Sequence, residues 1–382
     1  MHEHKQNQCK RKVKHRKNVM RLIIFCITVG IAFMFTYYQN LRKEISVRQE
    51  WLETVLTREK KWILENQGPE GEIYMNGSKA GDVNPYFACM AALGLLAETK
   101  NCPITETEKK AVGRYLDWHT GILLETDGKM GIYRKESGKL IYKEKADSED
   151  GYLGMYLFLM GKYLEKTEST ELPESWKNGI SLALKKIQSL MQDGITQVSE
   201  ENTTVYLMDN LEVWKGLYEL ELAGLEDTQV ISEIRKKIQK QIEKIFWDDA
   251  NQRWRIIGNS DRYHQTEFYP DGVAQIYPLI YEFPVKEKKK QKILYEQFTE
   301  RFQWQKLTKK RNGFLWAMTG MAAAQMGDIN NLLEMIRNYE AEYCENRKYP
   351  LYTGEAGWIC MECGKLYGLY ERKIKTGFIL CA

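Results

Sequence analysis

Hydrophobic residues recur along most of the chain at the spacing of α-helices, and short loops rich in Gly, Asn and Asp separate the helical segments. After residue 66, amphipathic segments alternate with shorter segments that are apolar nearly all round, as a buried helix must be. The six apolar segments span residues 84–98, 148–164, 209–223, 271–282, 313–326 and 355–369. Strand signal is confined to short loop pieces, at 128–133, 140–142 and 253–257. The pattern therefore predicts an all-α fold.

The amphipathic segments carry many charges and are expected to form outer helices. They span residues 106–121, 173–191, 229–246, 287–302 and 329–344, with a further helix expected at 47–66. Helical hairpins that cannot bury their apolar faces alone must stack or close on one another. Six such hairpins predict an (α/α)6 toroid whose inner helices line a central core. No Pro- or Ser-rich linker interrupts the pattern, so we expect one domain at 42–372 and a tail at 373–382.

The amino-terminal segment differs from the rest of the chain in charge and hydropathy. Residues 1–21 carry eight Lys or Arg and one acid, whereas the remaining residues hold 48 bases and 51 acids. Residues 22–41 carry no charge, and twenty helical residues span about 30 Å, the thickness of a bilayer's hydrocarbon core. Because basic flanks stay inside, the sequence predicts a cytoplasmic tail at 1–21, a single-pass anchor in the cell membrane at 22–41, and an extracytoplasmic domain.

A cleaved signal peptide is the competing interpretation of this apolar segment. It is disfavoured because no small-residue A-x-A pattern stands near residues 36–40, where a peptidase would cut. The excess of positive charge also bears on partners, since a nucleic-acid-binding protein needs that excess on its folded domain. Here the excess lies in the tail, so no nucleic-acid partner is expected.

The polar residues that open the apolar helices are the candidates for chemistry. Inner helices of a toroid run in one direction, so their amino-terminal ends share one face. The acids and amides at these starts are Asp82, Asn84, Asp147, Glu149, Asp150, Asp209, Asn210, Glu212, Asp271 and Glu355. Aromatic residues close to them are Tyr86, Tyr152, Trp214, Tyr269, Trp316 and Trp358. Rings stack on the apolar faces of sugars and paired carboxyl groups supply an acid and a base, so this face predicts carbohydrate chemistry.

Each of these features also has a structural interpretation. A single Asp at a helix start is more often a cap than a catalyst. Cys360 and Cys363 form a C-x-x-C pair on an apolar helix, where small buried thiols are the commoner role. His119 and His264 are the only histidines beyond the tail, and neither stands at ligand spacing from another His or Cys. We therefore expect no metal and no cofactor.

Local motifs add a resemblance to this pattern. The stretches ADSEDGYLGMYLFL at 146–159 and FYPDGVAQIYPL at 268–279, with the six hairpins, resemble the six-hairpin glycosidase superfamily, whose fold is an (α/α)6 barrel. NPYFACMAALGLL, at 84–96, resembles the first inner helix of its membrane-anchored bacterial members. Residues 146–159 are also similar to the acidic inner-helix motif of glycoside hydrolase family 8. That family places a catalytic Glu at the start of the first inner helix, where this chain has Asp82 and Asn84.

The resemblance implies a membrane-tethered, extracytoplasmic glycoside hydrolase that cleaves an oligo- or polysaccharide with inversion. It implies Asp82 as the general acid, Asp150 as the residue that binds the sugar at the scissile bond, and Asp271 as the base that activates water. The carbohydrate would further contact Asn84, Tyr86, Asp147, Asp209, Trp214, His264, Tyr269, Trp316, Glu355 and Trp358. Polysaccharide-export machinery is a candidate protein partner.

Two other functions stay open on the same barrel. One is a non-catalytic glycan-binding or exopolysaccharide-assembly protein, which the missing Glu at the first inner helix favours. The other is a toroidal polysaccharide lyase or sugar epimerase, in which His264 with Tyr263 and Tyr269 would abstract a proton. A lyase that acts on uronates also needs basic residues in its cleft, and the inner-helix starts offer only Arg262 and Arg311.

Overall fold

The structure, a computed structural model, describes residues 2–77, 81–136, 139–169, 171–225, 228–258, 260–307, 311 and 313–381. The chain divides into two compact units. The smaller unit consists of Met1–Leu52 and Tyr367–Ala382, and the larger unit is Glu53–Leu366. Two long helices, α1 (His2–Glu65) and α12 (Thr353–Cys381), contribute to both units.

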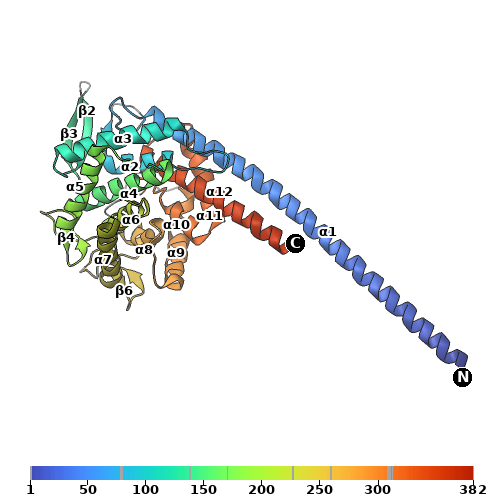
Figure 1. Ribbon diagram of the computed structural model, residues 1–382. Helices are drawn as coiled ribbons and strands as arrows, with labels where there is room; N and C mark the ends of the chain where they lie inside the picture. Colours follow the sequence, from blue (N-terminus) through green and yellow to red (C-terminus); the bar gives the residue numbers. More distant parts are fainter. Residues whose placement is uncertain are drawn as a thin grey trace. The chain divides into compact units, whose positions relative to one another are not determined.

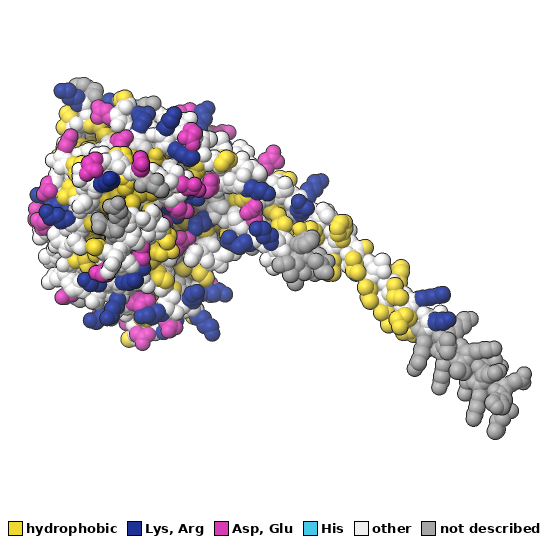
Figure 2. All heavy atoms as spheres, viewed as in Figure 1, with side chains coloured by type: hydrophobic (Ala, Val, Ile, Leu, Met, Phe, Trp, Pro, Cys, Tyr) yellow, Lys and Arg dark blue, Asp and Glu magenta, His cyan; other side chains and the backbone are white. Residues whose placement is uncertain are grey.

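The smaller unit contains the apolar segment predicted to be a membrane anchor. Within α1, the stretch Lys17–Glu65 is long and apolar enough to cross a membrane. Its apolar side chains, among them Phe25, Phe33 and Phe35, are exposed. Figure 2 shows these side chains in yellow along the helix. The predicted helix is therefore present, and a signal sequence would have the same properties.

Alternating inner and outer helices build the larger unit, and they confirm the predicted all-α toroid (Figure 1). Among the described residues, the inner helices are α2 (Pro85–Leu95), α4 (Glu149–Thr167), α6 (Leu207–Leu222), α8 (Val273–Ile280), α10 (Thr319–Met326) and the first part of α12. The outer helices are the end of α1 with α3 (Glu106–Glu125), α5 (Glu174–Leu190), α7 (Thr228–Phe246), α9 (Lys288–Phe302) and α11 (Ile329–Tyr339). Each outer helix precedes its inner partner, which gives six hairpins.

Glycines set the closest approaches between inner helices. A Cβ atom added to Gly216 of α6 would lie 2.2 Å from the carbonyl oxygen of Gly154 in α4. Between α2 and α12, a Cβ on Gly94 would lie 2.4 Å from the Cα of Gly357. Because these backbones touch, the last inner helix packs beside the first and the ring closes. The core of the larger unit is therefore a ring of helices buried on nearly every side, as their apolar composition predicts.

Short strands and irregular turns connect the helices. The strands are β1 (Asp82–Val83), β2 (Gly131–Glu136), β3 (Lys139–Lys145), β4 (Met191–Gln192), β5 (Ile195–Thr196), β6 (Trp247–Asp248) and β7 (Arg253–Trp254). The first three form an antiparallel sheet in the order β1-β2-β3, and β4-β5 and β6-β7 are two-stranded ribbons. Three shorter helical turns are η1 (Phe268–Gly272), η2 (Trp304–Lys306) and η3 (Glu340–Cys344). These connections surround the amino-terminal ends of several inner helices.

The glycine contact between α4 and α6 yields a test of this packing. We expect Gly216→Ala to lower the free energy of unfolding by about 1–3 kcal/mol, because the added methyl group must push two backbones apart. Urea denaturation of the full chain in a non-ionic detergent measures this difference. Gly121→Ala in α3 is the matched control, since no heavy atom lies within 4 Å of its added Cβ. Equal losses in the two variants would contradict this account of the packing.

Candidate active site

A cavity of about 360 Å³ opens among the amino-terminal ends of the inner helices. Cavities of this size are typical of small-molecule sites. Its wall is formed by Asn84, Tyr86, Phe87, Met90, Asp147, Ser148, Tyr152, Met208, Asp209, Glu212, Tyr269, Tyr277, Phe314, Trp316, Met318, Glu355 and Trp358. These residues come from every inner helix or from the loop that leads into it. Closure of the ring therefore brings together positions that are up to 274 residues apart in the sequence.

Eight of the predicted site residues line this cavity, as do Tyr152 and Glu212 from the same predicted face. The eight are Asn84, Tyr86, Asp147, Asp209, Tyr269, Trp316, Glu355 and Trp358. The shared direction of the inner helices is the reason that they meet. Their roles stay predictions, whereas their common location is a property of the fold.

Asp82, the predicted general acid, lies outside this set of residues. It sits in β1, where its carboxylate pairs with Arg134 at 2.6 Å and with Lys143 at 2.8 Å. The hydrogen bond from Arg134 is the main influence that lowers the pKa of this carboxyl group. A general acid must hold a proton, so an ionised, doubly paired carboxylate does not suit that role.

Asp150 is fully buried behind the cavity wall. Its carboxylate accepts hydrogen bonds from the Ser148 hydroxyl and the Thr196 hydroxyl, each at 2.7 Å, and from the Gly151 amide at 3.0 Å. Burial raises its pKa to about 6, although these hydrogen bonds favour the charged form. Asp150 thus fastens β5 to the start of α4 and does not reach the cavity surface.

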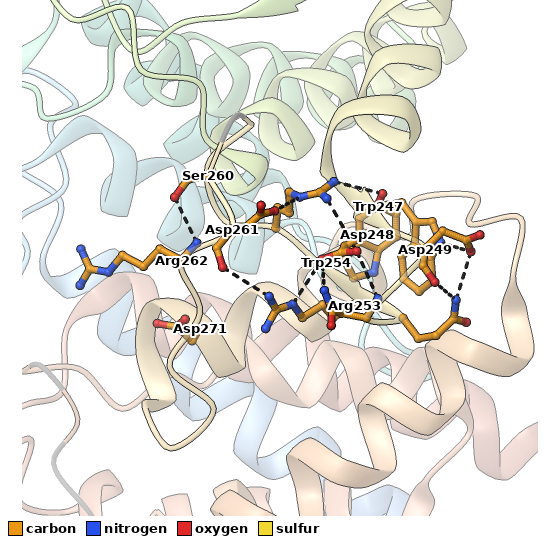
Figure 3. A network of polar contacts seen from close by, with 12 residues as sticks. Trp247, Asp248, Asp249, Arg253, Trp254, Ser260, Asp261, Arg262 and Asp271 are labelled. Carbon is orange, nitrogen blue, oxygen red and sulfur yellow. Dashed lines mark hydrogen bonds and ion pairs between the residues drawn. The ribbon is translucent and has the colours of Figure 1, made fainter.

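Asp271 and His264 hold a loop together outside the cavity wall. The buried Asp271 carboxylate accepts a hydrogen bond of 2.6 Å from the backbone N–H of His264, whose side chain is exposed. Figure 3 shows Asp271 near the loop that carries Ser260 and Arg262, apart from the polar network around Asp248. This arrangement fits a structural carboxylate that shapes the entry into α8.

Trp214 is also remote from the cavity wall. Its ring is 1% exposed and stacks on Tyr218, with ring centroids 5.3 Å apart and an interplanar angle of 12°. Its Nε1–H donates to Gln239. Trp214 therefore serves the contact between α6 and α7, because position 214 faces the opposite side of α6 from the cavity-lining positions of that helix.

Glu212 was expected on this face from the sequence but was given no role in the predicted site. It lies three residues after Asp209 on the same face of α6, and only 2% of its surface is exposed. Its Oε1 accepts hydrogen bonds from the hydroxyl groups of Tyr277 at 2.6 Å, Tyr281 at 3.2 Å and Tyr86. Burial raises its pKa to about 8, even though the three hydroxyl groups favour the charged form. The sequence predicted the place of Glu212 on this face but not its partners, because the tyrosines come from elsewhere in the chain.

Asp209 shares the cavity with Glu212. It is half-buried and bonds to the side chain of Ser148 at the start of α4. Burial is the main cause that raises its pKa well above the usual range, and the nearby Asp150 and Glu212 carboxyl groups raise it further. Burial thus favours the protonated forms of two acids on one face of α6.

Glu355 positions the loop that presents an aromatic pair to the cavity. Its carboxylate accepts the backbone N–H groups of Leu315 at 3.0 Å, Trp316 at 3.1 Å and Ala317 at 2.8 Å. Burial raises its pKa to about 7 against these bonds. Trp316 has a left-handed backbone with φ of 60°, and its ring lies 4.7 Å from that of Tyr269. The three amide bonds hold this unusual conformation, so Glu355 acts mainly on the loop.

The remaining wall is aromatic and lacks positive charge. Phe87 stacks on Phe314 with ring centroids 5.3 Å apart, and Tyr86 and Tyr152 lie 5.5 Å apart. None of the described residues that line the cavity is Lys, Arg or His. Within the described ranges, no group of three or more His, Cys, Asp or Glu residues is arranged to hold a metal ion.

Known proteins resemble this chain in fold but not in sequence. No protein-family model and no curated protein matches this chain. Among solved structures it is similar to a wild-type glycosidase, at 12% identity and a TM-score of 0.59, over 85% of this chain and 99% of that one. It is also similar to a D-mannose isomerase, at 13% identity and a TM-score of 0.53, over 83% of this chain and 97% of that one. A third similar structure is a sugar epimerase from a ruminal bacterium, at 10% identity and a TM-score of 0.51, over 82% of this chain and 98% of that one. The chain has the six-hairpin fold that these proteins share.

The buried acid of α6 makes a prediction about stability and pH. Between the ordinary pKa of Glu and its raised value near 8, folded Glu212 keeps a proton that the unfolded chain releases, so stability falls as pH rises. Glu212→Gln has no such proton, and its stability relative to the parent should rise by on the order of 1–3 kcal/mol from about pH 5 to pH 8. Urea denaturation across this range measures the difference. Glu300→Gln, at an exposed site in α9, should track the parent, and identical pH profiles for all three proteins would refute the prediction.

Proposed function

We propose that this protein is a glycoside hydrolase that cleaves an oligo- or polysaccharide. The observation that carries the proposal is a single cavity in which buried acids with raised pKa values, an exposed acid and several aromatic rings meet. Glycoside hydrolysis requires one carboxyl group that is protonated and a second that is ionised. The acids of this cavity differ sharply in burial. Because burial favours the protonated form of a carboxyl group and exposure favours the ionised form, one site can hold both.

Asp209 is the general acid in this proposal. It lines the cavity, and burial beside Asp150 and Glu212 favours its protonated form, so it can donate a proton to the oxygen of the leaving sugar. Glu212 supports Asp209 as a neighbouring acid and is oriented by tyrosine hydroxyl groups on its Oε1. These roles move the acid from Asp82 to a residue that faces the substrate.

Asp147 is the base in this proposal. It stands at the edge of the cavity just before α4, its side chain is exposed, and it has no ion-pair partner among the described residues. An exposed carboxylate beside the cavity can take a proton from an attacking water molecule. We expect inversion of the anomeric carbon, which proton NMR of the first product detects, because water rather than the protein supplies the new bond.

Aromatic residues at the cavity provide the binding surface for sugar rings. Trp316 and Tyr269 form a tilted pair, and 40% of the Tyr269 surface is exposed. Aromatic planes of this kind stack on the apolar faces of pyranose rings. One solved structure of similar fold is a glycosidase in complex with glucose, at 12% identity and a TM-score of 0.56 over 86% of this chain and 98% of that one. It supports a sugar as ligand.

Residues 22–41 of α1 tether the enzyme in this proposal. The segment is apolar and exposed, with a basic tail before it, so the tail stays in the cytoplasm and the larger unit faces the outside. A hydrolase held at this place would meet a polysaccharide as it leaves the cell. Polysaccharide-export machinery therefore remains the proposed protein partner.

A sugar epimerase or isomerase is the second candidate, because proteins with those names share the fold. Proton abstraction from a sugar carbon needs a base whose pKa lies near neutral pH. His fills this role most often. No described residue of the cavity wall is a His, since His264 lies on the exposed loop and His119 is buried against Tyr115 and Cys89. A His-dependent proton abstraction therefore lacks its residue in the described wall, whereas the hydrolase has its two carboxyl groups there.

The assay is release of reducing ends by the full-length protein in a non-ionic detergent, on β-glucans and amino-sugar polymers. We expect Asp209→Asn to lower kcat by about 10²–10⁴-fold, the usual contribution of a general acid. Asp82→Asn is the matched control and should keep near-parental turnover, because its carboxylate lies outside the cavity. Circular dichroism checks that both variants are folded. Glycan binding without turnover by the parent would select the non-catalytic alternative.

A further inference from the structure

The carboxyl groups that line the cavity lack the opposite charges that several buried carboxylates elsewhere in the larger unit have. Elsewhere, several buried carboxylates have cationic partners, although buried Asp150, Asp271 and Glu362 have none among the described residues. Glu219 pairs with Lys215 at 2.7 Å, and Glu59 pairs with Arg347. Asp248 likewise lies 3.7 Å from Arg253 and from Arg255. In most of these places the fold supplies the opposite charge that a buried carboxylate needs.

The carboxyl groups in the cavity have no such partner. Asp147, Asp209, Glu212 and Glu355 all line it, and none forms an ion pair with another residue in the described part of the chain. No Lys, Arg or His side chain belongs to the described wall either. A cationic group that entered the cavity would therefore meet several acids and no competing positive charge.

Two further features of the wall point to a ligand with a cation and hydroxyl groups. The electron-rich faces of Trp316, Tyr269 and Tyr152 belong to the wall, and ammonium groups bind to such faces. Trp358 is 2% exposed, and its Nε1–H is buried without a hydrogen-bond partner among the described residues. Because an unpaired buried donor is unfavourable, this N–H is suited to a ligand oxygen.

We propose that the cavity selects a sugar unit with a free, protonated amino group over neutral and N-acetylated units. This inference rests on the proposed function and names its substrate class. The ammonium group lies among the carboxyl groups and aromatic rings, while Trp358 donates to a sugar oxygen. A uronate is disfavoured, because the described wall holds no Lys, Arg or His to pair with its carboxylate.

The ligand charge also interacts with the protonation of the wall. Burial and the neighbouring Asp150 carboxyl group favour the protonated forms of Asp209 and Glu212. An ammonium ion nearby favours their ionised forms, so one of them gives up a proton as the charged sugar binds. Neutral sugars lack this attraction and meet a wall of protonated acids.

The test measures affinity by calorimetry on the full-length protein in a non-ionic detergent at pH 6.5. The probes are glucosamine and galactosamine, their N-acetylated forms, and glucose and galactose, which differ only in the group at carbon 2. We expect at least one amino sugar to bind about 10-fold or more tightly than both of its counterparts, a difference of about 1.4 kcal/mol. Equal affinities within each set, or no binding by any probe, would overturn the inference.

Variants connect the selectivity to the carboxyl groups. Glu212→Gln and Asp147→Asn should each reduce the ratio of affinities between the amino sugar and the neutral sugar by at least 3-fold. Asp82→Asn should leave the ratio unchanged, because its carboxylate pairs with Arg134 outside the cavity. An unchanged ratio in both cavity variants would overturn the inference, since the selectivity would then have another origin.

The same experiments separate this inference from the proposed function. Hydrolysis of a neutral glucan, together with equal affinities for all sugars, would retain the hydrolase and reject the preference for amines. Tight binding of an amino sugar without hydrolysis of any polymer would support the selectivity and reject the hydrolase.

Discussion

The fold depends on the need to bury helices that are apolar on all sides. A helix of this kind is stable in water only when neighbouring helices cover it on nearly every side. A closed ring meets this need, because each inner helix packs between two others and against an outer helix. Glycines at positions such as 154 and 216 let the backbones of α4 and α6 touch, so no gap is left between them. The direction of the inner helices then follows from the hairpin connections.

This same packing creates the conditions for chemistry. The amino-terminal end of a helix favours an ionised carboxylate through its dipole, whereas burial favours the protonated form. For Asp209 and Glu212 burial prevails, because the apolar ring excludes water from the base of the cavity. For Asp82 the opposite holds, since the basic residues of β2 and β3 surround it. Residues of similar type at neighbouring helix starts thus have different protonation states.

The fold was accessible from the pattern because hydrophobic periodicity is a local signal. The predicted apolar segment at 148–164 corresponds to α4, and that at 209–223 corresponds to α6. The fourth is shorter than predicted, because residues 268–272 form the irregular turn η1 before α8 begins. The site was less accessible. Nearness to a helix start does not tell which side chains face inward, so Asp150, Trp214 and Asp271 were placed with the cavity residues although they pack behind or beside the wall.

By itself, the sequence determined the helical hairpins, the long apolar segment after the basic tail, and the set of acids and rings near the inner-helix starts. Each of these is encoded by residues close together in the chain. Only the tertiary structure decided that three tyrosines, from α2, from α8 and from the turn after α8, bond to Glu212. It also decided that Glu355 holds the loop of Trp316. Those contacts join residues 39 to 126 positions apart, and such pairs become neighbours only when the ring closes.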